Sequence, residues 1–104
     1  MRFTWDAGKA ASNVAKHGVD FRDAVQIFTG RTVEWLDERF QYAQDRWVAV
    51  GFTKDKEILI VYVEEEEDLR RVISARKANH RERERYWREV GGQDRLGAPE
   101  QDAG

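Results

Sequence analysis

The sequence predicts a small α+β domain with the element order ααββββα and one four-stranded antiparallel sheet. Three observations predict it. Apolar residues recur at helical spacing up to residue 30, strand-like apolar runs follow up to residue 75, and an N-capped polar segment begins at residue 79. A chain of 104 residues suits one domain. We assign residues 1–90 to this domain and residues 91–104 to a polar tail.

Two short helices are expected at the N-terminus. Asp6 is a suitable N-cap for the first helix, and Gly18 follows its last residue. Asp20 caps the second helix, and Gly30 ends it. Its apolar stripe has members at i, i+3, i+4 and i+7, which are Phe21, Ala24, Val25 and Phe28. The short connection indicates a helical pair.

Four strands are expected in the middle of the chain. They are residues 31–37, 46–53, 57–63 and 69–75. Residues 39–44 read as a loop, and the "EEEED" run at residues 64–68 reads as a charged turn. Because the connections are short, we expect an antiparallel meander in which the apolar third strand is central.

The last strand and the last helix adjoin each other. Strand alternation predicts that Ile73 and Ala75 face the core, while Arg70, Val72, Ser74 and Arg76 lie on the other face. Asn79 begins the helix, and Glu82 completes an arrangement that resembles a capping box. We expect the helix to end near Val90, where Gly91 and Gly92 follow.

The charge of the chain is unevenly distributed. The net charge is −2, but residues 64–68 are all acidic, whereas residues 69–88 hold eight Arg or Lys against two Glu. This balance argues against a general nucleic-acid binder and permits one local basic site. Cysteine is absent, which excludes disulfides and thiol catalysis.

Several classes of site have no support in the sequence. The two histidines, His17 and His80, are far apart, and neither a metal-ligand cluster nor a glycine-rich phosphate loop is present. Ser74 lacks the context of a hydrolase nucleophile. No signal peptide or long apolar run is visible, so we expect a cytoplasmic protein without membrane contact and without a metal or other cofactor.

The basic strand–helix junction at residues 70–88 has two readings. Guanidinium groups match phosphate oxygens with their fork of donors. However, a helix rich in Arg and Glu is more often a solvated surface, and Tyr86 and Trp87 are more often packing residues. Lys16 and His17 also have a plain explanation, because cations at a helix C-terminus interact favourably with its dipole. Composition and spacing leave both readings open.

Three motifs carry a resemblance to a known family. They are "F-T-W-D-x-x-K-x-x-x-N-x-x-K-H-G-V-x-F-x-x-A" from Phe3, "D-R-W-V-A-V-G" from Asp45, and "R-V-I-S-A-R-K-A-x-x-x-E-R-x-x-Y" from Arg71. With the order of elements, they resemble the BrnT family, RelE-like ribonuclease toxins of bacterial type II toxin–antitoxin pairs. The match covers about residues 3–87, and residues 37–45 carry no part of it.

The resemblance implies a RelE-like fold and a metal-independent endoribonuclease that transfers an RNA phosphodiester to its own 2′-hydroxyl and so inhibits translation and growth. It also implies a DNA-binding, BrnA-like antitoxin that forms a hetero-oligomer with the toxin. The expected phosphate clamps are Arg46, Arg71 and Arg76. The expected proton-transfer, orienting or stacking groups are Lys77, Glu82 and Tyr86. The expected RNA-binding residues are Lys16, His17, Ser74 and Arg83.

Two alternatives stay open at this point. The same basic junction could serve a non-catalytic module that binds RNA or protein. The chain could also be a decayed toxin that retains only antitoxin binding. Growth arrest on expression, lost when Arg76 is replaced by alanine, would separate an active ribonuclease toxin from these two alternatives.

Overall fold

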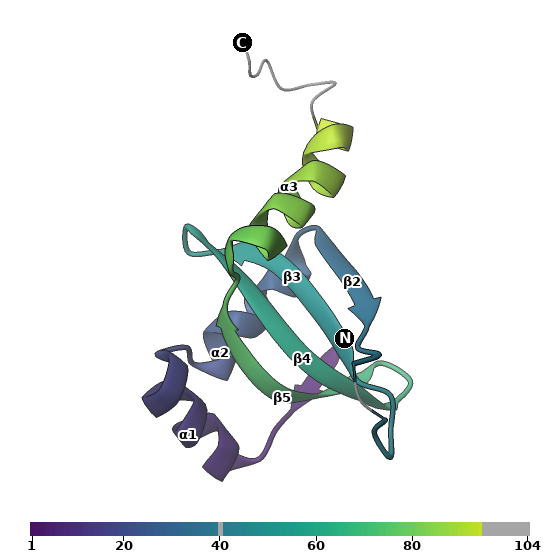
Figure 1. The fold of residues 1–104 in the computed structure, drawn as a ribbon. Helices are drawn as coiled ribbons and strands as arrows, with labels where there is room; N and C mark the ends of the chain where they lie inside the picture. The colour runs from purple at the N-terminus through teal and green to yellow at the C-terminus, as the bar shows by residue number, and fades with distance from the viewer. Residues whose placement is uncertain (40, 95–104) are drawn as a thin grey trace.

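The protein is a five-stranded sheet with helices on both faces, as seen in a computed structural model that describes residues 1–39 and 41–94 (Figure 1). The strand order is β1-β5-β4-β3-β2. The strands are β1 (Arg2–Thr4), β2 (Thr32–Leu36), β3 (Trp47–Thr53), β4 (Lys56–Glu66) and β5 (Leu69–Lys77). The helices are α1 (Ala7–His17), α2 (Phe21–Ala24), the 3₁₀ helix η1 (Val25–Thr29) and α3 (His80–Asp94). The prediction of an α+β domain is confirmed.

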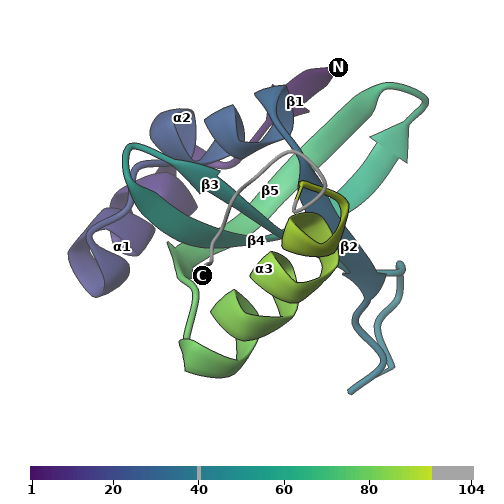
Figure 2. The same ribbon diagram turned by 90° about the horizontal axis from the view of Figure 1, so that it is seen from above.

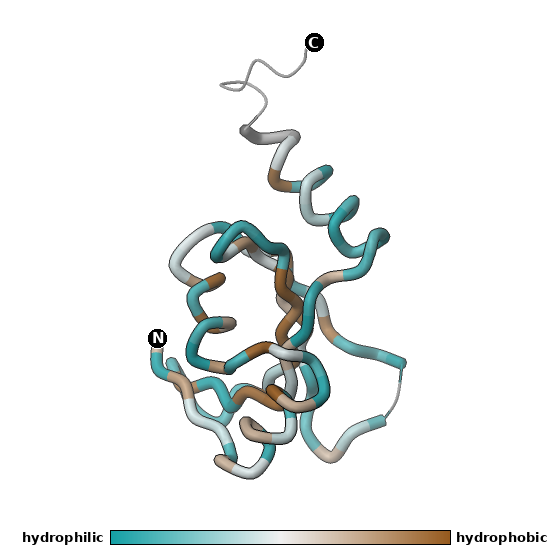
Figure 3. Tube along the Cα trace, turned by 90° about the vertical axis from the view of Figure 1, so that its left-hand side faces the viewer, coloured by the Kyte–Doolittle hydropathy of each residue, from teal (hydrophilic) through white to brown (hydrophobic). Residues whose placement is uncertain are grey.

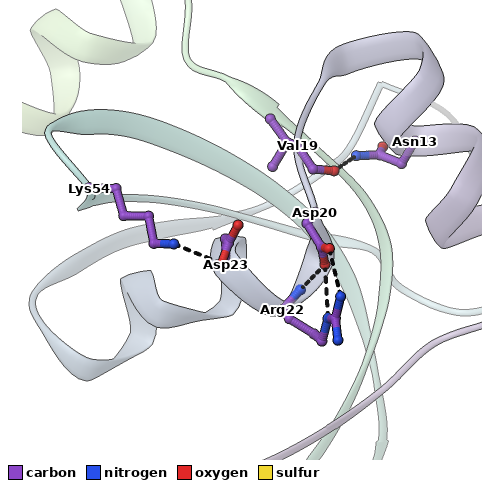
Figure 4. Close-up of polar contacts among 6 residues, drawn as sticks. All are labelled: Asn13, Val19, Asp20, Arg22, Asp23 and Lys54. Carbon is purple, nitrogen blue, oxygen red and sulfur yellow. Dashed lines mark hydrogen bonds and ion pairs between the residues drawn. The ribbon is translucent and has the colours of Figure 1, made fainter.

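The N-terminal helical pair forms with the caps that the sequence predicts. The Asp6 carboxylate accepts a hydrogen bond from the Lys9 N–H at 2.9 Å, and Gly18 ends α1 with a left-handed φ of 71°. Asp20 caps α2 and also binds the Arg22 side chain (Figure 4). The second helix is α-helical for only one turn, because it continues as the tighter η1.

The number of strands differs from the prediction. The sheet has five strands, and β1 is parallel to β5, with Arg2 opposite Leu69 and Thr4 opposite Arg71. The four strands β2 to β5 do form the expected antiparallel meander. A strand of three residues has too few positions to show a period of two, and its partner is far away in the sequence. The predicted four-stranded antiparallel sheet is therefore wrong at this edge.

The acidic run is also different from the expected turn. β4 continues through Glu66, so only Glu67 and Asp68 remain in the turn, where Asp68 has a φ of 68°. Cross-strand charge pairing favours the longer strand, because Glu64 lies opposite Arg70 and the Glu65 carboxylate is 2.6 Å from Arg71 Nε.

A β-bulge in β5 overturns the predicted alternation of side chains. Ser74 pairs with Val61 but Val72 pairs with Tyr62, so Ile73 is an extra residue. As a result Val72 and Ala75 are both fully buried on the same face, and Ile73 is only half-buried. The predicted inward Ile73 and outward Val72 are therefore wrong.

The same bulge separates two arginines that strict alternation places together. Arg70 lies against the rings of Phe28 and Tyr62, on the face that α1 and α2 cover. Arg76 pairs with Leu59 on the opposite face. Alternation fails here because it assumes one residue for each position of the partner strand, and β5 has one residue more.

The last helix begins as predicted and ends later. Asn79 Oδ1 accepts from the Glu82 N–H at 2.9 Å, and Glu82 Oε1 accepts from the Asn79 N–H at 2.8 Å, which confirms the capping box. The helix then runs through Gly91 to Asp94, so the predicted stop at Gly91 is wrong. Glycine costs about 1 kcal/mol in a helix but does not forbid it. Residues 95–104 of the predicted tail lie outside the described residues.

Each face of the sheet has its own apolar core. Figure 2 shows α1 and α2 on one face of the sheet and α3 on the other, and Figure 3 shows hydrophobic residues, in brown, on the strands and on the helices. On the α1 face, Val19 and residues of α2, η1 and β3 to β5 bury ten side chains together. Gly51 allows close packing there, since a Cβ atom would lie 2.6 Å from Ile27 Cβ. On the α3 face, Tyr86 and Val90 of the helix are buried. Of the described helices, none is long and apolar enough to cross a membrane.

Candidate active site

An open groove of about 390 Å³ lies on the α3 face of the sheet. It exists because α3 packs mainly on β2 and β3 and leaves the rest of this face uncovered. Apolar side chains of the sheet form its floor, and charged side chains form its walls. The lining residues are Trp35, Leu36, Asp37, Glu38, Arg39, Val48, Leu59, Val61, Arg76 and Glu82.

Two predicted site residues, Arg76 and Glu82, meet in this groove. Arg76 Nη1 and Nη2 donate to the two Glu82 carboxylate oxygens, each at 2.9 Å. Burial raises the pKa of Glu82, but the Arg76 hydrogen bonds and the Asn79 N–H lower it more, so the pKa is below its ordinary value. Hydrogen bonding to Glu82 in turn raises the pKa of Arg76. Glu82 thus caps α3 and aligns the guanidinium group with the groove.

The loop after β2 supplies the opposite wall. Asp37 is buried and accepts from Arg39 Nε at 3.0 Å, Arg39 Nη2 at 3.1 Å and the Tyr42 hydroxyl at 3.1 Å. The Arg39 side chain lowers the pKa of Asp37 to about 2, against the opposing effect of burial. Arg39 also lowers the pKa of Glu82 through its charge, as the last of several causes.

Two further predicted clamps lie at the end of the groove rather than in it. Arg46 stacks on the Tyr42 ring at 4.3 Å from its centroid. Arg71 pairs across β4 with Val63, so it shares the face of the groove, but its Nε donates to Glu65 and its Nη2 to Gln44 at 3.3 Å.

Three predicted residues of the junction lie elsewhere. Tyr86 is buried, and its hydroxyl donates to the Arg31 carbonyl at 3.1 Å. Arg83 donates to the Ala78 carbonyl at 3.0 Å and does not line the groove. Lys77 is exposed at the end of β5. The structure does not bring these side chains into the groove, and their roles stay predictions.

The predicted RNA-binding residues Lys16, His17 and Ser74 do meet, but in a second pocket between α1 and β5. It has a volume of about 210 Å³ and is also lined by Lys9, Ser12, Asn13 and Ile73. The predicted site residues are therefore divided between two places.

The sequence reasoning missed Asp37 and Arg39, because the loop that contains them carries no part of the family resemblance. Their signal in the sequence is the short spacing of Asp37, Arg39 and Tyr42, which allows one carboxylate to bind both later side chains. Arg85 of α3 stacks on the Trp35 ring at 4.1 Å from its centroid, and Trp35 lines the groove.

The groove is suited to binding an anion through guanidinium groups. Arg39 and Arg76 lie on opposite walls, and ionised Asp37 and Glu82 hold them. Neither His nor Cys lines the groove, and no three His, Asp or Glu side chains are grouped as metal ligands within residues 1–39 and 41–94. The reactive groups that the groove offers are thus arginines and carboxylates.

Comparison with known proteins gives the family. The model of the ribonuclease toxin BrnT of type II toxin–antitoxin systems matches residues 5–82, three quarters of the chain. The chain belongs to the BrnT family. The resemblance seen in the three sequence motifs is confirmed, and the function of the chain is that of a ribonuclease toxin of a type II toxin–antitoxin system, with an RNA target and an antitoxin partner.

A solved structure agrees with the BrnT assignment. The ribonuclease toxin BrnT of Brucella abortus is 28% identical, with a TM-score of 0.61, over 77% of this chain and 99% of the Brucella chain. A search of curated proteins finds no match. The mixed α+β architecture, with its five-stranded sheet, is similar to that of the Brucella toxin.

Proposed function

We propose that this chain cleaves RNA in the groove of the α3 face without a metal ion or other cofactor. The 2′-oxygen forms a bond to the adjacent phosphorus as the P–O5′ bond breaks, the 2′-hydroxyl proton goes to a base, and the 5′-oxygen takes up a proton from water, so that a 2′,3′-cyclic phosphate and a 5′-hydroxyl result. The observation that supports it is the Arg76–Glu82 pair on one wall with Arg39 on the other, in a cavity of about 390 Å³. Guanidinium groups match two phosphate oxygens and stabilise the charge that develops on them.

Glu82 is the group whose role depends most on the substrate. Its pKa is below its ordinary value mainly because Arg76 binds it, which makes it a weak base in the free protein. A phosphate that takes over the Arg76 donors would leave Glu82 without this partner, and its pKa would rise. We propose that Glu82 aligns Arg76 before binding and accepts the 2′-hydroxyl proton afterwards.

The remaining predicted residues have supporting roles in this proposal. Arg71 and Arg46 lie at one end of the groove, where they can hold the RNA strand on one side of the cleaved bond. Lys77 is exposed at the end of β5, directly after Arg76, and can contact the same RNA strand. Tyr86 acts through packing, since its hydroxyl is bound to the Arg31 carbonyl.

The biological setting is part of the same proposal. We infer a single RelE-like toxin domain that extends past the predicted boundary at residue 90, because α3 continues to Asp94. The toxin acts in the cytoplasm on RNA and so inhibits translation and growth. A BrnA-like, DNA-binding antitoxin neutralises it in a hetero-oligomer. Membership in a family of ribonuclease toxins of type II toxin–antitoxin systems supports the RNA target and the antitoxin partner.

The test is cleavage by purified Arg76→Ala, with Arg88→Ala as the matched control, because Arg88 is an exposed arginine of α3 outside the groove. Loss of one charge-stabilising donor lowers rates by about 10²–10³-fold. We expect that loss for Arg76→Ala, a rate within about twofold of wild type for Arg88→Ala, and little change for Tyr86→Phe.

End-group analysis completes the test. A 2′,3′-cyclic phosphate and unchanged cleavage in the presence of a chelator are expected. Full activity of folded Arg76→Ala would remove the groove as the site. Tight RNA binding by wild-type protein without any cleavage would favour the non-catalytic module instead.

A further inference from the structure

The second pocket lies at an edge of the sheet that no strand covers. β1 pairs with β5 only from Leu69 to Arg71, so the edge of β5 beyond this point faces α1. Asn13 of α1 occupies the place of a strand there, because its side chain binds both the N–H and the carbonyl of Ala75. The pocket of about 210 Å³ opens beside this contact.

The charge of this pocket differs from that of the groove. Lys9 and Lys16 line it together with His17, and none of its lining residues is acidic. In the described part of the chain, neither lysine has a carboxylate within 4.0 Å, whereas exposed Lys54 binds Asp23 at 3.0 Å (Figure 4). Two unpaired cations that share a concave site attract an anion.

Hydroxyl groups add hydrogen-bond donors to the cations. Ser12 lies between the two lysines on α1, so Lys9, Ser12 and Lys16 are at i, i+3 and i+7 on one side of the helix. Ser74 of β5 also lines the pocket. Lysine and serine donors that converge on one cavity suit the oxygens of a phosphate.

We propose that this pocket binds a phosphate of the RNA strand next to the bond that is cleaved, a proposal that rests on RNA as the substrate of the groove. Ser74 and Arg76 are two residues apart on β5, which places their Cα atoms about 6.6 Å apart. A strand held by Arg76 in the groove therefore reaches the pocket by passing around the open edge of β5.

The chemistry of the pocket favours RNA over a protein partner. Ile73 is the apolar side chain that lines it, and no aromatic residue does. Protein interfaces are usually anchored by buried aromatic or arginine side chains in apolar pockets, and this site offers no place for one. A phosphodiester needs only cations and donors, and both are present.

The test is RNA binding by the double variant Lys9→Gln/Lys16→Gln. Its matched control is Lys56→Gln/Arg88→Gln, which removes the same charge from exposed positions outside both sites. The probe is a fluorescent single-stranded RNA with 2′-O-methyl groups, which cannot be cleaved by 2′-hydroxyl attack. Its affinity is measured by anisotropy over a range of salt concentrations.

We expect the pocket variant to bind this RNA about tenfold more weakly and to lower the slope of log affinity against log salt by about 0.7, since the contact to one phosphate is lost. On cleavable RNA it should raise KM and leave kcat within about twofold of wild type. Equal losses in the pocket and control variants would overturn the proposal.

Two further results would also overturn it. If the pocket variant loses affinity for the antitoxin but not for RNA, the pocket is a protein site. If inorganic phosphate shifts the NMR signals of His17 while the RNA does not, the pocket binds a free anion only. Binding is measured on RNA that cannot be cleaved, so the two proposals can fail separately. If the wild-type protein binds this RNA but cleaves no RNA, the proposed activity is refuted and the proposed binding of phosphate by the pocket is not.

Discussion

Replacing Asn13 by alanine should destabilise the fold strongly, although Asn13 belongs to neither set of proposed RNA contacts. Its amide nitrogen donates to the Val19 carbonyl at 2.9 Å and to the Ala75 carbonyl at 2.8 Å, and its oxygen accepts from the Ala75 N–H at 3.2 Å (Figure 4 shows the first of these). The residue is only 6% exposed, so water cannot readily replace these bonds.

The size of this destabilisation follows from the backbone groups that lose their hydrogen-bond partner. Three buried backbone groups lose their partner, and each unsatisfied group costs about 1 kcal/mol or more, so the loss in the free energy of unfolding is about 3 kcal/mol. For a domain of this size that corresponds to a fall in Tm of about 12 °C. The N-terminal helices and β5 should loosen together, since Asn13 joins α1 to both Val19 and Ala75.

Urea unfolding followed by fluorescence measures this loss, because the chain has four tryptophans. Ser12→Ala is the matched control, since Ser12 is exposed on the same helix, and its effect should stay within about 0.5 kcal/mol. A loss below about 1 kcal/mol for Asn13→Ala would refute the reasoning that these bonds hold the open edge of β5.

Two other predictions concern stability. The pKa of Asp37 is lowered to about 2 chiefly by Arg39, so its stabilising effect is complete above the ordinary value of 3.8 and is lost as the pH falls through about 2. Acid titration of unfolding should therefore show a smaller loss of stability between about pH 4 and 2 in Asp37→Asn than in wild type, and parallel curves would contradict this. Gly51→Ala should cost about 1–3 kcal/mol, because its Cβ would lie 2.6 Å from Ile27 Cβ, whereas Gly30→Ala, where nothing lies within 4 Å, should be nearly neutral in the same thermal melts.

The elements of this fold with a strong local signal were predictable. The caps of α1 and α3 each depend on a side chain within three residues of the backbone group that it binds, as Asp6 and Asn79 show. The strands β2 to β5 are each at least five residues long, and the connections between β3, β4 and β5 are short. β1 had neither feature, because its three residues become a strand only through pairing with β5.

The candidate site was predicted in part, for a similar reason. Arg76 and Glu82 are six residues apart and flank one junction, so sequence reasoning could place them together. Arg39 comes from a loop whose position depends on the sheet, and no local pattern relates it to Arg76. Lys16 and Ser74 also meet only because α1 packs along β5.

The sequence by itself determined the family, the α+β class and the helix caps, because these depend on residue types at short, fixed spacings. Only the tertiary structure decided that the basic segment is divided between two sites. The bulge at Ile73 puts Arg70 on the α1 face and Arg76 on the α3 face, and α3 leaves part of the sheet open as a groove. Register between strands and the packing of helices on a sheet are set by contacts between distant residues, which a periodic pattern along one strand does not contain.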